Sequence, residues 1–167
     1  MATTTATSTE CSRIAEQLRR AFAGEAWHGS SLRELLADVN NTQANSRPLA
    51  AAHSIWELIL HIGTWVGHAH ASMRGVSMPQ FVENMPPEQN WPEIKDSGPA
   101  AWRQTVDNTL RSGEQLAAAI QNFGDDRLGE TVPGRDYAFY NLFHGIVQHS
   151  IYHGGQIAIL KKARNPE

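Results

Sequence analysis

Two histidines near the end of the chain have a spacing that suits the binding of one metal ion. His149 and His153 lie four residues apart in the segment 140–162, YNLFHGIVQHSIYHGGQIAILKK, which we predict to be a helix. At about 100° per residue, side chains four apart lie within about 40° of each other on one face, one turn apart. Two imidazoles in this arrangement can reach the same ion, and the sequence contains no other His-x-x-x-His pair. A complete metal site therefore needs a further ligand from another part of the chain.

His61 is the best candidate for that third ligand. It follows Leu58 and precedes Trp65 on the apolar face of a helix that we predict over about 50–74. A lone histidine on such a face is more often a hydrogen-bonded core residue than a metal ligand, so both roles stay open for His61 on the residues alone. His149 and His153, considered as a pair without His61, could likewise be either metal ligands or hydrogen-bonded core residues.

The other histidines suit the site less well. By the same count of about 100° per residue, His144 lies about 180° around the last helix from His153. His53 lies about 80° away from the apolar stripe that contains His61. His68 is close to that stripe in azimuth but about 10 Å along the helix axis. We therefore expect these three to lie outside the site, and we expect His28 and His70 at the surface or in loops.

Each ligand ring has a second nitrogen that needs a partner of its own. Gln156 and Glu57 each lie about one turn from a proposed ligand and are the candidate partners. Trp65 and Tyr152 are candidate pocket walls, although packing alone also explains them. Three neutral imidazoles leave at least one position on an ion open, which is typical of catalytic sites. A divalent ion in such a site can lower the pKa of bound water to about 7 or deprotonate a bound thiol.

Helices must position these residues. Apolar residues recur at three- and four-residue spacings, in segments bounded by capping residues, glycine and proline. The predicted helices cover about 9–23, a shorter stretch that starts at the capping box Ser31–Glu34, about 50–74, about 97–123, and 140–162. The stretch NNTQANSRP at 40–48 is predicted to be a connection, with Pro48 in the first turn of the next helix. The segment 125–136 is predicted to be a turn-rich loop.

The connection over 76–98 is long for a compact domain and contains Pro79, Pro86, Pro87 and Pro92. Long connections tend to be functional or to bridge distant ends. Its roughly 23 residues can span about 75 Å, well over the roughly 36 Å of a 24-residue helix. We therefore predict an all-α fold, a four-helix bundle in which this crossover lets the second and third long helices run parallel.

The composition is that of an ordinary soluble globular protein, with 41% hydrophobic and 19% charged residues in a chain of 167. We predict a disordered tail over 1–8 and a single domain over 9–167. The net charge of −3 lacks the basic footprint of a nucleic-acid binder. The single cysteine, Cys11, cannot form an intrachain disulfide, which favours a reducing cytoplasm. No stretch approaches the roughly 18 apolar residues of a transmembrane helix.

Other chemistry has little support in the sequence. It contains no His-Glu-x-x-His motif, no Gly-rich phosphate loop and no Gly-x-Ser-x-Gly elbow. The chain therefore offers a histidine-based site for a single metal ion, or no recognisable catalytic site.

Several segments resemble the DinB-like (YfiT-like) helical bundles. The most specific resemblance is in the last helix, over His144–His149 and Ile151–Ala158. Three shorter pieces agree with it: GEAWHG at 24–29, Arg47-Pro48, and HSIWEL at 53–58 leading to His61. The resemblance extends over nearly the whole chain, from about residue 13 to 162.

This resemblance implies an up-down-down-up four-helix bundle with the long crossover between helices 2 and 3. It also implies a three-histidine metal site, in which His61 comes from the second helix and His149 and His153 from the fourth. Such proteins commonly bind a divalent ion, often nickel or zinc, and many form homodimers. Some of them transfer low-molecular-weight thiols such as bacillithiol, mycothiol or glutathione.

We therefore expect a metal-dependent enzyme, a low-molecular-weight thiol S-transferase or a hydrolase, with a small-molecule substrate and a thiol as the co-substrate of the transfer. The alternative is a non-catalytic metal-binding or stress-response module, whose ion holds the second and fourth helices together. A fourth protein ligand would favour this alternative, whereas a pocket over an open position would favour an enzyme.

Overall fold

The computed structural model describes residues 8–78 and 85–164. In these ranges it contains helices and no strand, with two isolated bridges, Ala26–Gly29 and Thr131–Ala138. The four long helices are α1 (Glu10–Ala23), α4 (Ile55–Ser72), α6 (Pro99–Gln121) and α7 (Phe139–Arg164). Short helices are α2 (Leu32–Leu36), α3 (Asn41–Asn45), α5 (Pro87–Asn90) and the 3₁₀ turn η1 (Asp125–Arg127). The all-helical class predicted from the sequence is confirmed.

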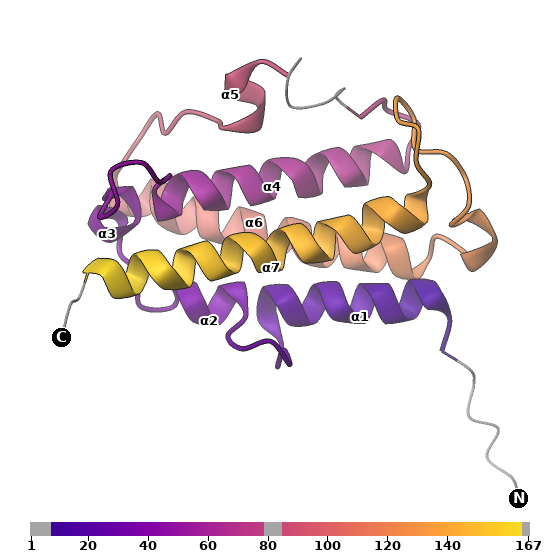
Figure 1. Cartoon of the computed structure of the whole chain (residues 1–167), viewed down its shortest axis with the longest axis horizontal. Coiled ribbons are helices and arrows are strands. Elements are labelled where there is room, and N and C mark those ends of the chain that lie inside the picture. The colour runs from indigo at the N-terminus through magenta and orange to yellow at the C-terminus, as the bar shows by residue number, and fades with distance from the viewer. Residues whose placement is uncertain (1–7, 79–84, 165–167) are drawn as a thin grey trace, which may run out of the picture.

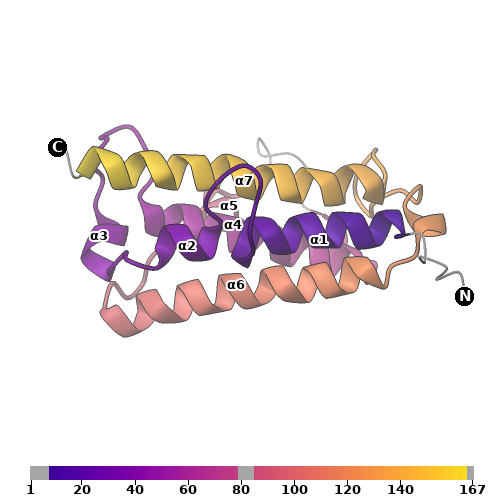
Figure 2. The ribbon, with the colours of Figure 1, turned by 90° about the horizontal axis from the view of Figure 1, so that it is seen from below.

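The long helices lie side by side, as Figures 1 and 2 show from two directions. Helix α1 packs on α6 and α7, and α4 packs on the same two helices. The short α2 continues the line of α1 along one edge (Figure 2). The buried apolar side chains, among them Phe22, Trp56 and Phe143, form one cluster that draws on all four long helices. In the described ranges, no helix is long and apolar enough to cross a membrane.

Capping residues explain where the helices begin. Helix α4 starts at Ile55 because Ser54 and Glu57 form a capping box, in which the Ser54 N–H donates to the Glu57 carboxylate at 2.7 Å. The predicted start near residue 50 is therefore too early, and Pro48 does not lie in the first turn of this helix. A second box, between Asn40 and Gln43, nucleates α3 inside a stretch that we predicted to be a connection.

One glycine permits the close approach of α1 and α6. A Cβ placed on Gly113 of α6 would lie 2.3 Å from the Phe22 ring carbon Cδ1, far inside van der Waals contact. Phe22 is 2% exposed and belongs to the core. Only a residue without a side chain therefore fits at position 113, although glycine weakens a helix interior.

The described part of the connection between α4 and α6 carries the short helix α5, which lies beside α4 (Figure 1). Helix α5 contacts α4, which places Asn90 and the following Trp91 against the middle of that helix. Two predicted features lie outside the described residues, namely residues 1–7 of the predicted tail and Pro79 of the long connection.

Candidate metal centre

The packing of α4 on α7 brings His61, His149 and His153 together. The Nε2 atom of His149 lies 2.9 Å from Nε2 of His61 and 3.1 Å from Nε2 of His153. One ligand atom from each of the three residues lies within 4.8 Å of the other two. Two nitrogens bound to one tetrahedral zinc ion at about 2.0–2.1 Å are about 3.3 Å apart. The cluster therefore has nearly the spacing that a shared ion requires.

Hydrogen bonds on the outer nitrogens set the tautomers of two of these rings. Nδ1 of His61 lies 2.8 Å from the backbone carbonyl oxygen of Asn90, so this nitrogen carries the hydrogen and donates it. Nδ1 of His153 lies 2.6 Å from Oε1 of Gln156 and donates in the same way. Both rings therefore direct a lone pair on Nε2 toward the centre of the cluster.

In this arrangement the three facing Nε2 atoms have too few hydrogens to form hydrogen bonds between every close pair. Nε2 of His149 lies within hydrogen-bond distance of two acceptors, the Nε2 atoms of His61 and His153, and it can donate to only one of them. In the neutral cluster at least one pair of nitrogens thus faces lone pair to lone pair. A cation between the rings would accept all three lone pairs, so the donor set fits a metal ion.

Burial keeps the three imidazoles in the form that binds metals. Burial lowers the pKa of His149 to about 3, with a further contribution from His153 and His61 nearby. Burial also lowers the pKa of His61 to about 4, against the opposing effect of the Asn90 carbonyl. The pKa of His153 is lowered for the same first reason. Neutral imidazole is the ligand form, so protons do not compete with an ion near pH 7.

Asn90 and Trp91 complete the surroundings of His61, and sequence reasoning missed both. Besides the carbonyl that binds His61, Asn90 offers its side-chain oxygen to the indole N–H of Trp65 at 2.9 Å. The Trp91 ring lies between the rings of His53 and His61, with centroids 3.5 Å and 4.0 Å away and nearly parallel planes. The length of the connection 76–98 was the one signal that pointed to this segment.

The two proposed partner residues have different outcomes. Gln156 holds His153 as expected. Glu57 makes hydrogen bonds to Ser54 and Arg47 and caps α4, and the partner of His61 is the Asn90 carbonyl. A backbone carbonyl thus takes the place that the sequence suggested for a carboxylate.

The three histidines expected outside the cluster do lie outside it. His53 packs against Trp91, and His68 has its ring edge-on to Trp65 with centroids 5.9 Å apart. His144 lies on another face of α7, where its Nε2 is 3.4 Å from the carboxylate of Glu10. None of them joins the metal-ligating group found among the described residues.

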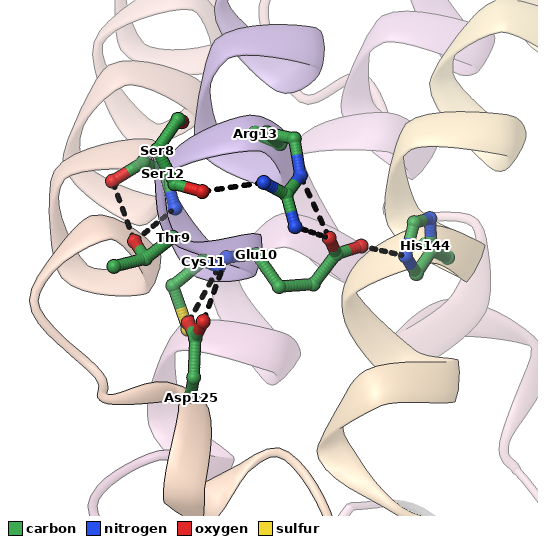
Figure 3. Close-up of polar contacts among 8 residues, drawn as sticks. All are labelled: Ser8, Thr9, Glu10, Cys11, Ser12, Arg13, Asp125 and His144. Carbon is green, nitrogen blue, oxygen red and sulfur yellow. Dashed lines mark hydrogen bonds and ion pairs between the residues drawn. The ribbon is translucent and has the colours of Figure 1, made fainter. Parts of the chain in front are cut away.

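Figure 3 shows His144 within a separate polar cluster at the start of α1. The Glu10 carboxylate lies between His144 and Arg13, and Asp125 accepts the N–H groups of Glu10 and Cys11 at 2.8 and 2.9 Å. Burial, together with Asp125, raises the pKa of the Cys11 thiol to about 11. A buried thiol with a raised pKa forms little of the reactive thiolate near pH 7.

Comparison with known proteins identifies the family of the chain. Residues 26–157 match the sequence model of the DinB superfamily. The chain belongs to the DinB superfamily. No curated protein and no solved structure matched the chain.

In this DinB superfamily chain, a cavity of about 480 Å³ opens beside the three histidines. Its walls include Trp65 and Tyr152, and the other lining residues are Asn90, Tyr137, Asn141, Leu142, Gly145 and Ile146. A second cavity of about 470 Å³ shares Tyr152 and His153 with the first and is bordered by Trp91 and Gln156. The volume of the first is typical of small-molecule sites.

Proposed function

We propose that the protein is a metal-dependent enzyme that binds one divalent ion through His61, His149 and His153. The observation that carries the proposal is the convergence of three neutral Nε2 atoms at the wall of a cavity of about 480 Å³. Zinc and nickel are the favoured ions, because imidazole nitrogens suit both. A divalent ion there would supply Lewis acidity toward a water or a thiol in its open position.

The described residues favour an open site over a structural one. The metal-ligating group contains three histidines, and no carboxylate or cysteine of the described chain joins it. A structural zinc site normally has four protein ligands, whereas a catalytic site has three and an open position. The alternative, a non-catalytic metal-binding or stress-response module with a structural ion, has no fourth protein ligand among the described residues.

Between the two reactions, the lining of the cavity favours thiol transfer over hydrolysis. Hydrolysis generally uses a carboxylate or a further histidine that moves a proton to the leaving group. No Asp, Glu, Lys or Arg is among the described residues that line the cavity, and its only histidines are the three ligands. Transfer of a low-molecular-weight thiol to an electrophile needs less proton transfer, since the thiol loses its proton on binding an ion.

The residues around the ligands would hold the site in one geometry. Asn90 and Gln156 fix the orientation of two imidazole rings through their Nδ1 atoms. Trp91 covers one face of His61, and Trp65 is held by Asn90. These contacts keep the nitrogens aimed at one point.

We also propose a homodimer in the cytoplasm and the up-down-down-up bundle. In support of the topology, the colours in Figure 1 run in one direction along α4 and α6 and in the opposite direction along α1 and α7. In support of the dimer, Tyr152 and Ile159 are 65% and 58% exposed on one stripe of α7. Light scattering at micromolar concentration tests the dimer, and a purely monomeric mass would contradict it.

The enzyme proposal is tested with protein loaded with zinc or nickel. The loaded protein is incubated with a panel of low-molecular-weight thiols and a chromogenic aryl halide, and release of the halide is followed. We expect turnover that requires both the ion and one class of thiol, and that disappears with His149→Ala. A loaded protein that holds one equivalent of metal but turns over none of these pairs would contradict the transferase proposal and leave the metal site standing.

A further inference from the structure

The cavity beside the three histidines has almost no charge of its own. None of its described lining residues is an acid, a lysine or an arginine, and Leu142, Ile146, Trp65 and Tyr137 give it apolar walls. The guanidinium of Arg135 lies 5.9 Å from the centre of the Tyr137 ring, but Arg135 is not among the residues that line the cavity. A charged group in the part of the cavity away from the histidines would therefore lose hydration without a charged side chain of the described lining to pair with it.

Several polar atoms of the inner wall already have hydrogen-bond partners within the protein. The indole N–H of Trp65 donates to the side-chain oxygen of Asn90, and the Asn90 carbonyl accepts from His61. Of the remaining polar side chains of the described lining, Asn141 and Tyr152 are exposed to solvent and lie at the mouth, and Tyr137 is half-buried. The strongest attachment point that the described lining offers a ligand is the open position beside the histidine nitrogens.

Gly145 provides part of the space. It lies in α7 one turn before His149, on the same face of the helix, and it lines the cavity. A Cβ built on Gly145 would meet nothing within 4 Å, in contrast to the tightly packed Gly113. Packing therefore does not require a glycine at position 145. The absence of a side chain there enlarges the cavity.

We propose that this cavity binds the uncharged, apolar body of a substrate whose single metal-binding head group, such as a thiol, reaches the histidine site. We also propose that Gly145 sets the size of the body that fits. This inference rests on the metal site of the proposed function and goes beyond it in naming the class of molecule and the residue that selects it. A thiol that carries carboxylates would have to keep them at the mouth.

The test uses binding, so it does not depend on turnover. The protein is loaded with Co²⁺, whose absorption reports a bound thiol through a thiolate-to-cobalt charge-transfer band. Thiophenol and 4-mercaptobenzoate are titrated as a matched pair, because they differ chiefly by one carboxylate. We expect thiophenol to bind at least tenfold more tightly, because burying an unpaired carboxylate is costly. Equal affinity, or tighter binding of 4-mercaptobenzoate, would overturn the inference.

Gly145→Ala and Gly145→Leu test the role of the glycine, with Gly155→Leu as the matched control. Gly155 lies in the same helix on the opposite side from His153, lines neither cavity beside the cluster, and its Cβ also meets nothing within 4 Å. On cobalt-saturated protein, thiophenol affinity should fall slightly with Gly145→Ala, at least tenfold with Gly145→Leu, and not at all with the control. Unchanged affinity in Gly145→Leu would overturn the role of Gly145.

The outcomes of these experiments distinguish a failure of this inference from a failure of the proposed metal site on which it rests. A protein that binds no Co²⁺ removes the metal site, and with it this inference. A protein that binds Co²⁺ and both thiols without preference keeps the metal site and contradicts the apolar cavity as the binding place.

Discussion

Replacing His153 by alanine is expected to abolish the part of the stability that comes from metal binding. An ion that binds only the folded protein stabilises it by mass action, by about 2.7 kcal/mol when its free concentration is 100 times the Kd. For a chain of this length, each kcal/mol shifts Tm by about 2–4 °C. The parent protein with excess ion should therefore melt about 5–11 °C above the same protein in chelator.

In His153→Ala this difference should fall to within about 1 °C, because His61 and His149 alone leave an ion with two protein ligands. The substitution also opens a cavity in a site that is 7% exposed, which lowers Tm with and without chelator alike. The quantity to compare is thus the chelator-dependent shift of each variant, measured by calorimetry or circular dichroism. Metal content after dialysis, measured by atomic emission, gives an independent readout.

His144→Ala is the control for this experiment. His144 lies in the same helix but contacts Glu10 at the start of α1, away from the cluster. It should keep one equivalent of metal and the full chelator-dependent shift, and the same holds for alanine at His53 or His68. The site as described would be refuted if His153→Ala retained one equivalent after dialysis, or if the parent melted identically with and without chelator.

Three further predictions follow from particular contacts. Gln156→Leu should weaken metal affinity about 10- to 100-fold by removing the acceptor from His153, with little change in chelator-treated stability, as competition with a chromophoric chelator would show. Gly113→Ala should lower the free energy of unfolding by about 1–3 kcal/mol in urea titrations, because its Cβ would overlap Phe22, whereas unchanged stability would show that the two helices can separate at no cost. The metal-free protein should lose stability as the pH falls from about 6.5 toward 3. In this range His149 stays neutral in the folded protein, where its pKa is lowered to about 3, but takes up a proton in the unfolded chain. A free energy of unfolding that rises on acidification would contradict this prediction.

Local geometry accounts for what could be predicted of this site. His149 and His153 share a face of any α-helix that contains both, because a helix turns by about 100° per residue wherever it occurs. The apolar stripe around His61 likewise marks the face of α4 that turns toward α7. The apolar pattern alone therefore made His61 a candidate ligand. The resemblance to the DinB-like bundles was what implied that His61 binds a metal together with His149 and His153.

Helix boundaries show the limit of such patterns. The predicted start of α4 is too early because Pro48 was assigned to the first turn of this helix, whereas the hydrogen bonds of the capping box at Ser54 and Glu57 decide where it begins. Helix α3 was missed because its five residues carry too short a pattern to stand out. The second box, at Asn40 and Gln43, was present in the sequence but was not recognised.

By itself, the sequence determined the helical class, the pairing of His149 with His153, and the candidacy of His61, because each depends on interactions within one helix. Only the tertiary structure decided that the Asn90 carbonyl, and not Glu57, binds His61, and that Trp91 lies between two histidines. Asn90 and His61 are 29 residues apart and meet through the path of a connection, and a backbone carbonyl is common to every residue. A contact of this kind has no residue type and no spacing to mark it, so it appears only when the chain has folded.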